Sequence, residues 1–174
     1  MKYIIASDIH GNLEYMQKLD QFINFEKDDL DGLILLGDLL NNYHYYDPEE
    51  ISKVAALLNK HAKIITCVKG NGDTYHDSDL LLFDTSSEYL KMNIDGIDYI
   101  ITHGHLLSKY DYLLEGNYAF IGHTHVYDLE GKHFNPGSVG FPRHGVEHTC
   151  LLYKNRKLYL INLDNYAIIQ EKIV

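Results

Sequence analysis

The sequence predicts a mixed α/β fold in which two β-sheets pack together and helices cover their outer faces. Up to Asn71, short hydrophobic runs alternate with helical patterns, which is typical of right-handed β–α–β units and a largely parallel sheet. After Asn71 the pattern changes to hairpin signals, which are typical of antiparallel strands. A chain of 174 residues fits one domain with a single sizeable core, so we expect one domain over residues 1–174.

The first three strands are predicted at residues 3–6, 33–37 and 64–70. Each is a short hydrophobic run without polar alternation, the pattern of a strand that is buried on both faces. Two further runs of this kind, at residues 99–102 and 119–122, predict buried strands in the second half of the chain.

Two helices are expected between the first three strands. The first begins after Asn12, a favourable N-cap residue. The second begins after Asp47, with Pro48 at the first helical position and Glu49 and Glu50 near the positive end of the helix. Apolar residues at helical spacing mark the buried faces: Leu13, Met16, Leu19, Phe22 and Ile23 in the first helix, and Ile51, Val54, Ala55 and Leu58 in the second.

Hairpins are predicted at two places. Asp95-Gly96 separates two apolar runs, at residues 89–94 and 97–101, and is a strong signal for a two-residue turn. Residues 149–153 and 157–163 flank Lys154-Asn155-Arg156, which indicates a second hairpin. Residues 165–174 are expected to add a last strand.

Composition indicates an ordinary soluble globular protein, with 45% apolar and 23% charged residues. No run approaches the roughly 18 apolar residues of a membrane span. Asp8 and His10 lie where a secretory signal would be apolar, so we expect a cytoplasmic protein without a membrane partner. Cys67 and Cys150 lie in strand-like sequence and are expected to be buried thiols.

The formal net charge of −10 argues against an extended nucleic-acid surface, because such binding depends on Lys and Arg. It is compatible with a phosphate-bearing substrate in a locally positive pocket. We therefore expect a small-molecule or nucleotide phosphoester as the partner.

Seven residues of metal-ligand type stand at the ends of the five buried runs. In an open α/β sheet, ligands collect outside the carboxyl ends of the strands. Five strand ends would therefore direct oxygen and nitrogen donors toward one place, which predicts a metal site, and one for two metals. The seven residues are Asp8, His10, Asp38, Asn71, His103, His123 and His125.

Each motif taken alone also fits a structural role, such as a capped turn, a loop or a strand end. Together, in this order, they closely resemble the calcineurin-like metallophosphoesterase superfamily, whose pattern is D-x-H, G-D, G-N-H-[DE], H and G-H-x-H. The small size and the segment 135–138 (Asn-Pro-Gly-Ser) look like the YfcE-type phosphodiesterase branch. The matching segments are Asp8-Ile9-His10, Gly37-Asp38, Gly70-Asn71-Gly72-Asp73, Thr102-His103-Gly104-His105 and Gly122-His123-Thr124-His125.

The resemblance implies a four-layer α/β/β/α sandwich with a dinuclear metal centre. Carried over by position, Asp8, His10, Asp38 and His125 would hold one metal, and Asn71, His103, His123 and Asp38 the other. The Asp38 carboxylate would bridge them, which agrees with its two oxygens. A hydroxide between the two metals would attack the phosphorus of a phosphate diester. Carboxylate, amide and imidazole donors suit Mn, Fe, Co, Zn or Ni, and we expect Mn²⁺ from the resemblance.

One position departs from the family pattern. Gly72 stands where many members have a histidine that contacts the phosphate or protonates the leaving group. We expect His105 or His76 to contact the phosphate instead, and His105 is favoured because its motif position is constant. A surface or supporting role is the alternative for both, and His44 is a further histidine near Asp38.

Other residues near the motifs are expected to have mainly structural roles. We expect Asp73 to support a metal-bound histidine without binding the metal itself. Arg143 is expected to form a structural salt bridge rather than to guide a phosphate. Tyr43, Tyr45 and Tyr46 are expected to pack, with a pocket for an aromatic leaving group as the alternative.

Other functions are compatible with the same fold. A scaffold or binding protein is one, since a retromer subunit of related structure acts chiefly in that way, and a phosphomonoesterase is another. No predicted ligand is missing from this chain, which favours an enzyme. A flavodoxin-like module without metals would leave the strand-end histidines unexplained. Relatives form dimers or larger assemblies, and the sequence leaves open whether this chain forms a homo-oligomer.

Overall fold

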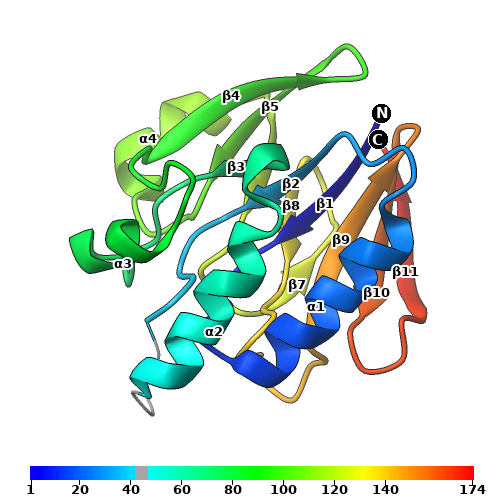
Figure 1. Ribbon diagram of the computed structural model, residues 1–174. Helices are drawn as coiled ribbons and strands as arrows, with labels where there is room; N and C mark the ends of the chain where they lie inside the picture. The colour runs from blue at the N-terminus through cyan, green and yellow to red at the C-terminus, as the bar shows by residue number, and fades with distance from the viewer. Residues whose placement is uncertain (42–46) are drawn as a thin grey trace.

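A computed structural model gives the structure of the chain and describes residues 1–41 and 47–174. It contains one sheet of six strands and one of five, with helices on their outer faces (Figure 1). Outside the described residues lie His44, the further histidine near Asp38, and the three tyrosines that were expected to pack, Tyr43, Tyr45 and Tyr46.

The six-stranded sheet has the strand order β11-β10-β9-β1-β2-β3. Its three parallel neighbours, β1, β2 and β3, come from the β–α–β part of the chain, and the hairpin strands extend it with antiparallel neighbours. The sheet is therefore mixed. Its strands are β1 (Lys2–Ala6), β2 (Gly32–Leu35), β3 (Ile65–Cys67), β9 (Thr149–Lys154), β10 (Lys157–Asn162) and β11 (Ile168–Ile173).

The five-stranded sheet has the order β4-β5-β6-β8-β7. Neighbours β5, β6 and β8 are parallel, and β4 and β7 are antiparallel to the strands beside them. This sheet is also mixed. Its strands are β4 (Tyr89–Ile94), β5 (Ile97–Thr102), β6 (Tyr118–Ile121), β7 (Tyr127–Asp128) and β8 (His133–Pro136).

Helices α1 (Leu13–Glu26) and α2 (Pro48–Asn59) lie side by side over the six-stranded sheet (Figure 1). Helix α4 (Leu107–Leu114) packs through Leu114 on Ile100, Ala119 and Ile121 of the other sheet. The expected four-layer α/β/β/α order is thus confirmed. A short 3₁₀ helix (Ala62–Ile64) and helix α3 (Tyr75–Leu80) flank β3. None of the helices in the described part of the chain has the length and apolar character that a membrane span requires.

Both predicted N-caps are present. The Asn12 side chain accepts a hydrogen bond from the backbone N–H of Tyr15, and the Asp47 side chain accepts from Glu49 and Glu50. Each satisfies N–H groups that the first turn of a helix leaves unpaired.

The two hairpin turns consist of Asp95-Gly96 and Asn155-Arg156, and all four residues have positive φ. Positive φ at both central residues is the geometry that joins two twisted strands by two residues. Lys154, predicted to lie in the second turn, instead ends β9.

Two local predictions need correction. The strand predicted at residues 64–70 is only Ile65–Cys67, because the residues beyond it form the loop that carries Asn71. Asn135 and Pro136, predicted in a turn, belong to β8. That strand is too short and polar to show a strand pattern in sequence, and its pairing with β6 and β7 creates it.

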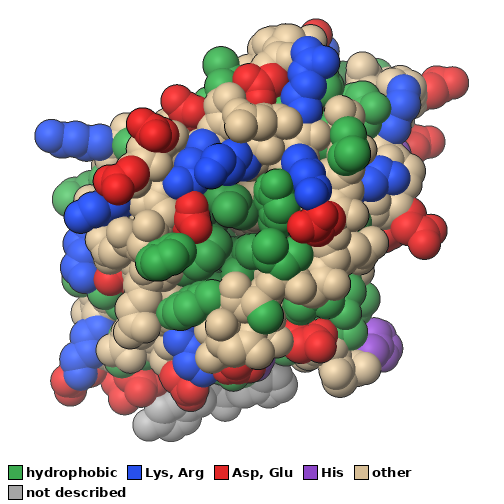
Figure 2. All heavy atoms as spheres, turned by 90° about the vertical axis from the view of Figure 1, so that its right-hand side faces the viewer, with side chains coloured by type: hydrophobic (Ala, Val, Ile, Leu, Met, Phe, Trp, Pro, Cys, Tyr) green, Lys and Arg blue, Asp and Glu red, His purple; other side chains and the backbone are tan. Residues whose placement is uncertain are grey.

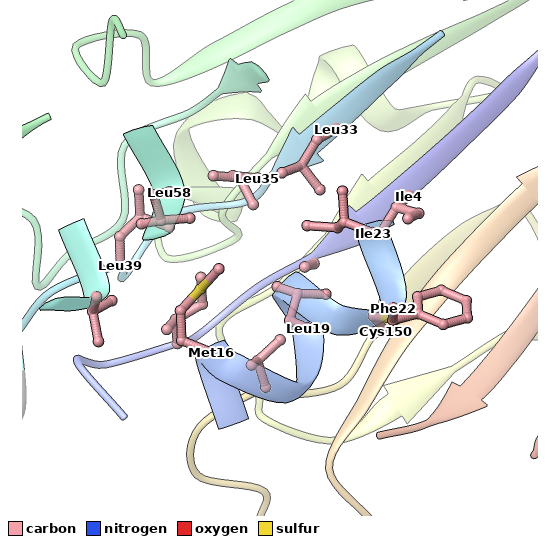
Figure 3. Close-up of a cluster of buried hydrophobic side chains, with 14 of the residues drawn as sticks. Ile4, Met16, Leu19, Phe22, Ile23, Leu33, Leu35, Leu39, Leu58 and Cys150 are labelled. Atoms are coloured by element: carbon pink, nitrogen blue, oxygen red, sulfur yellow. The ribbon is translucent and has the colours of Figure 1, made fainter. Parts of the chain in front are cut away.

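Two hydrophobic cores hold the layers together, and β1 contributes to both. Ile4 and Ala6 face the core under α1 and α2, whereas Tyr3 and Ile5 face the core between the sheets. Alternate residues of a strand point to opposite faces, so a strand covered on both sides is apolar throughout. Figure 3 shows the first core, where Met16, Leu19 and Ile23 of α1 meet strand residues such as Leu33 and Leu35. Cys67 and Cys150 are buried free thiols, as expected.

Apolar side chains also reach the surface beside the edge strand β11. Figure 2 shows hydrophobic groups gathered at the centre of this face, with charged side chains around them. They line a shallow groove that includes Phe22, Phe25, Tyr159, Tyr166 and Ile168. Ile173, farther along β11, is 77% exposed.

The first core accounts for much of the stability of the fold. Replacement of the fully buried Leu19 by Ala should lower the free energy of unfolding by about 2–5 kcal/mol, because the cavity cannot close completely. Phe25→Ala on the same helix is the matched control, since Phe25 is 80% exposed and its loss should cost less than about 0.5 kcal/mol. Urea unfolding of both variants measures the difference, and equal midpoints would contradict this view of the core.

Candidate metal centre

The loops that follow β1, β2, β3, β5 and β6 meet at one edge of the two sheets. In the loops after β1 and β2, the backbone N–H groups of Asp8 and His10 donate to the carbonyls of Gly37 and Asp38, at 3.1 and 3.0 Å, respectively. The backbone N–H of His123, from the other sheet, donates to Asp8 Oδ2 at 3.0 Å. The predicted convergence of strand ends is therefore present in the structure.

A first group of donor atoms consists of Asp8, His10 and His125, all buried. Asp8 Oδ1 lies 3.6 Å from His10 Nε2 and 3.3 Å from His125 Nε2. The two Nε2 atoms are 3.3 Å apart.

A second group consists of Asp8, Asp38 and His103, which are also buried. Asp38 Oδ2 lies 3.5 Å from His103 Nε2 of this group and 3.6 Å from His10 Nε2 of the first group. It therefore connects the two groups. Asn71 Oδ1 lies 3.2 Å from His103 Nε2. The Asp8 carboxylate belongs to both groups.

Three of the histidines direct Nε2 toward this centre. Nδ1 of His10, His103 and His125 lies 2.6–2.7 Å from the carbonyl oxygens of Asn41, Leu36 and Phe141, respectively. A carbonyl can only accept, so each Nδ1 carries the proton and each Nε2 of the neutral ring offers a lone pair. These backbone carbonyls give no sequence signal.

In both buried carboxylates, those of Asp8 and Asp38, one oxygen accepts a hydrogen bond and the other is directed at the centre. Asp8 Oδ2 accepts from the Ser7 hydroxyl at 2.6 Å, while Asp8 Oδ1 is buried without a hydrogen-bond partner. Asp38 Oδ1 accepts from the backbone N–H of Gly72 at 2.6 Å, while Oδ2 faces His10 and His103. Gly72 thus holds a candidate ligand through its backbone.

This donor set fits divalent cations. Acceptors face acceptors across the centre, which is unfavourable unless positive charge lies between them. Ligands that bind one cation at about 2.1 Å stand roughly 3.0–3.4 Å apart, for angles from a right angle to tetrahedral. The separations of 3.2–3.6 Å between the converging atoms are close to this range.

Five of the seven predicted ligands have backbone in the left-handed region, with φ of 50–70°. This conformation costs a non-glycine residue of the order of 1–3 kcal/mol and persists only where the surrounding structure enforces it. The sequence gives no direct sign of such a concentration of strain. The five residues are Asp8, His10, Asp38, His123 and His125.

Glycines allow the loops to approach closely. A Cβ atom on Gly70 would overlap the Asp38 carboxylate, and one on Gly122 would overlap the Ser7 hydroxyl and come within 3.1 Å of Asp8 Oδ2. Gly70 of the G-N motif and Gly122 of the G-H motif are therefore required, because the neighbouring loops leave no room for a Cβ atom.

Asp73 lies close to the centre but does not contact a predicted histidine ligand in the way we expected. Its buried carboxylate accepts from the backbone N–H groups of Asp38, Leu39 and Gly70 at 2.7–2.9 Å. It thereby joins the loop of Asp38 to the loop of Asn71. The sequence indicated that Asp73 supports a metal-bound histidine, but backbone carbonyls accept from Nδ1 of His10, His103 and His125.

The electrostatics of the centre favour added positive charge. Burial alone would raise the pKa of Asp8, but His10, His103 and His125 outweigh it and hold this pKa below its ordinary value. Burial also opposes ionisation of Asp38, yet His103 lowers its pKa. Conversely, burial would lower the pKa values of His10 and His103, but Asp8 and Asp38 raise them above the ordinary value of histidine.

The remaining histidines differ in position. The ring of His123 lies 5.0 Å from that of His103, and the ring of His105 lies 5.3 Å from His103 and 6.2 Å from His123. His105 Nδ1 is buried without a hydrogen-bond partner. His76 is exposed on α3, and no hydrogen bond or ring contact joins it to the ligands in the described residues.

Arg143 follows the last motif on an exposed loop, and its backbone N–H donates to the carbonyl of His125 at 3.2 Å. The expected salt bridge is not formed with any residue that the structure describes.

Comparison with known proteins agrees with the motifs. The model of the calcineurin-like phosphoesterase superfamily domain matches residues 1–157. Phosphodiesterase YfcE of Escherichia coli (strain K12) is 32% identical over 183 aligned residues, which cover 98% of this chain and 97% of the relative.

Solved structures show the same similarity. The structure of YfcE, a phosphoesterase from E. coli, aligns with a TM-score of 0.87 and 31% identity over the whole of both chains. A novel archaeal phosphodiesterase aligns over the whole of both chains with a TM-score of 0.65 and 20% identity. Vacuolar protein sorting 29 from Cryptosporidium parvum gives 0.64 and 16%, over 99% of this chain and 98% of that one. The last two share the fold alone.

Metal affinity should fall as the pH is lowered, because protons and metal compete for the same Nε2 atoms. The raised pKa values of His10 and His103 mean that these rings keep their protons to a higher pH than an ordinary histidine does. Affinity is therefore lost as the pH falls through these pKa values and recovers above them.

Calorimetric titration with Mn²⁺ at about pH 6 and about pH 8 tests this, with two buffers of different ionisation enthalpy at each pH. We expect tighter binding at the higher pH and more protons released on binding at the lower pH. An affinity that does not change with pH would contradict the assignment of these nitrogens as ligands.

Proposed function

The chain belongs to the calcineurin-like phosphoesterase superfamily, and on that premise we propose that it hydrolyses phosphate diesters at a centre of two divalent metal ions. Membership makes it a hydrolase of phosphoester bonds that uses divalent metal. The observation that carries the proposal is the convergence of the Nε2 atoms of His10 and His125 on Asp8 Oδ1, which is buried without a hydrogen-bond partner.

The seven ligands are proposed to divide between two metal positions. Asp8, His10 and His125 hold one metal, as the first donor group suggests. His103 holds the other, with Asn71 and His123 beside it. Asp38 serves both, since its Oδ2 stands between His10 and His103.

When bound, two divalent metals supply a nucleophilic hydroxide at neutral pH and positive charge for the phosphate oxygens. The protein residues fix the geometry in which this happens. Backbone carbonyls aim the His10, His103 and His125 rings, and the Ser7 hydroxyl and the Gly72 N–H each hold one oxygen of a carboxylate. A rigid arrangement of this kind needs little reorganisation as charge develops at phosphorus.

A diester is proposed as the substrate class because YfcE, 32% identical over nearly the whole chain, is a phosphodiesterase. A phosphomonoester remains the alternative substrate. The net charge of −10 favours a small or nucleotide diester over a long nucleic acid. The buried donors comprise oxygen and imidazole nitrogen without thiolate, which supports Mn²⁺, with Fe, Co, Zn or Ni as alternatives.

Asp73 is proposed to be a positioning residue. Its three hydrogen bonds hold the backbone of the Asp38 loop against the Gly70 loop, so it sets the separation of two ligand-bearing segments. The support is its burial together with these hydrogen bonds, which engage both of its carboxylate oxygens.

A scaffold function is not favoured. Vps29 shares the fold at 16% identity, whereas the phosphodiesterase shares 32%. We also propose a cytoplasmic location. The exposed apolar residues of β11, among them Ile168 and Ile173, support assembly as a homo-oligomer, because exposed edge strands tend to pair.

The role of Asp38 can be tested by Asp38→Asn, which keeps the shape of the side chain but removes its charge. Hydrolysis of bis(p-nitrophenyl) phosphate with Mn²⁺ should fall by at least about 10²-fold, because the substitution takes negative charge from both metal positions. Asp111→Asn, an exposed change on α4, is the matched control and should keep full activity. Equal rates for wild type and Asp38→Asn with every metal tried would refute the enzymatic proposal.

His105 is proposed to contact the phosphate in place of the motif histidine absent at Gly72. Its position beside His103 and His123, with Nδ1 buried and unpartnered, supports this role. His105→Ala should lower kcat by about 10²-fold without loss of bound metal, because only the contact with the reacting phosphate is removed. His76→Ala is the control and should leave kcat unchanged. The opposite pattern would transfer the role to His76, and two unchanged rates would exclude both.

A further inference from the structure

The segment between β8 and β9 runs directly beside the first metal-ligand loop. The backbone N–H groups of Val139 and Gly140 donate to the carbonyls of Ser7 and Asp8, each at 3.0 Å. This segment therefore follows the backbone of the loop that carries Asp8, although 130 residues separate Ser138 from Asp8 in the chain.

Within this segment, the Ser138 hydroxyl connects two parts of the centre. It is fully buried, donates to the Asp8 carbonyl at 2.8 Å and accepts from the backbone N–H of Phe141 at 2.8 Å. Both hydrogen bonds are to backbone groups, so the hydroxyl fixes the distance between the Asp8 loop and Phe141.

Phe141 in turn orients His125. Its carbonyl lies 2.6 Å from His125 Nδ1, and that contact places the proton on Nδ1 and leaves the Nε2 lone pair free. His125 Nε2 faces Asp8 Oδ1 at 3.3 Å. The connections form a closed loop: Asp8 carbonyl, Ser138 hydroxyl, Phe141 backbone, His125 ring and Asp8 carboxylate.

The two ligands that this loop joins are both held in left-handed backbone, with φ of 56° at Asp8 and 62° at His125. Such residues need neighbours that prevent relaxation. The other hydroxyl near Asp8, that of Ser7, holds only the carboxylate. Among the described residues, Ser138 is the side chain that bonds both to the backbone of one predicted ligand and to the backbone N–H of Phe141, the residue whose carbonyl orients a second ligand.

We propose that Ser138 is a positioning residue that sets the tautomer and direction of His125 relative to Asp8, and so prepares one of the two metal positions. The inference rests on the proposed metal centre. A Ser138 that only contributed to folding would affect stability and leave both the His125 tautomer and the metal affinity as they are.

The test compares Ser138→Ala with Thr149→Val. Thr149 is an equally buried hydroxyl that donates to the Pro136 carbonyl at 2.6 Å, so it anchors the same end of β8 without contact to a predicted ligand. The histidine tautomers of the metal-free protein are read by nitrogen-15 NMR, with His125 assigned from a His125→Gln spectrum. Mn²⁺ affinity is measured by calorimetry.

In wild type and Thr149→Val, we expect His125 to be protonated on Nδ1 and both metals to bind. In Ser138→Ala, His125 should show a mixture of tautomers, and the affinity of one metal position should fall about 10–100-fold, the usual effect of losing a group that supports a ligand. The second position should keep its affinity.

A Ser138→Ala protein with the wild-type tautomer and wild-type affinity would overturn the inference. If Ser138→Ala does not fold, Ser138→Cys takes its place, because the thiol nearly keeps the volume but forms only weak hydrogen bonds, and the same two readouts apply. Failure of the proposed metal centre is distinguishable, since wild type itself would then bind no Mn²⁺ while the tautomer comparison would still report on Ser138.

Discussion

The structure is organised around buried imidazole nitrogens and carboxylate oxygens that crowd together, among which Asp8 Oδ1 has no hydrogen-bond partner. Nε2 of His10, His103 and His125 and one oxygen each of Asp8 and Asp38 lie within a few ångströms of one another, buried from solvent. In an interior of low polarity, such an arrangement is unfavourable unless positive charge occupies the centre. The raised pKa values of His10 and His103 have the same cause: a proton partly supplies what a metal would supply fully.

The rest of the fold provides the free energy that holds these groups together. Five predicted ligands have strained backbone, and the loops that carry them pack so closely that Gly70 and Gly122 cannot bear a side chain without overlap. The cores on both faces of β1 oppose relaxation of the loops, because any movement of its carboxyl end would disturb two packed layers. Burial of apolar area is thus linked directly to the geometry of the site.

Support for the ligands comes mostly from backbone groups. Carbonyls of Asn41, Leu36 and Phe141 orient three histidines, and the Gly72 N–H holds Asp38. Side chains that assist, such as Asp73 and Ser138, themselves act on backbone. At Gly72, where the motif histidine is absent, the backbone N–H keeps a structural task, and His105, which we propose as the phosphate contact, lies beside His103.

The sequence by itself determined the fold class, the two capped helices, the Asp95-Gly96 turn and the family, because each depends on local patterns or on residue types in a fixed order. It also indicated that donor side chains would gather at one edge, and five of the seven predicted ligands form the two donor groups, with Asn71 beside His103. Only the tertiary structure decided that Asp8 belongs to both donor groups, that Asp73 binds backbone rather than histidine, and that Asn135 lies in a strand. These features depend on contacts between segments far apart in the chain and on carbonyls that every residue possesses, so no local pattern of side chains records them.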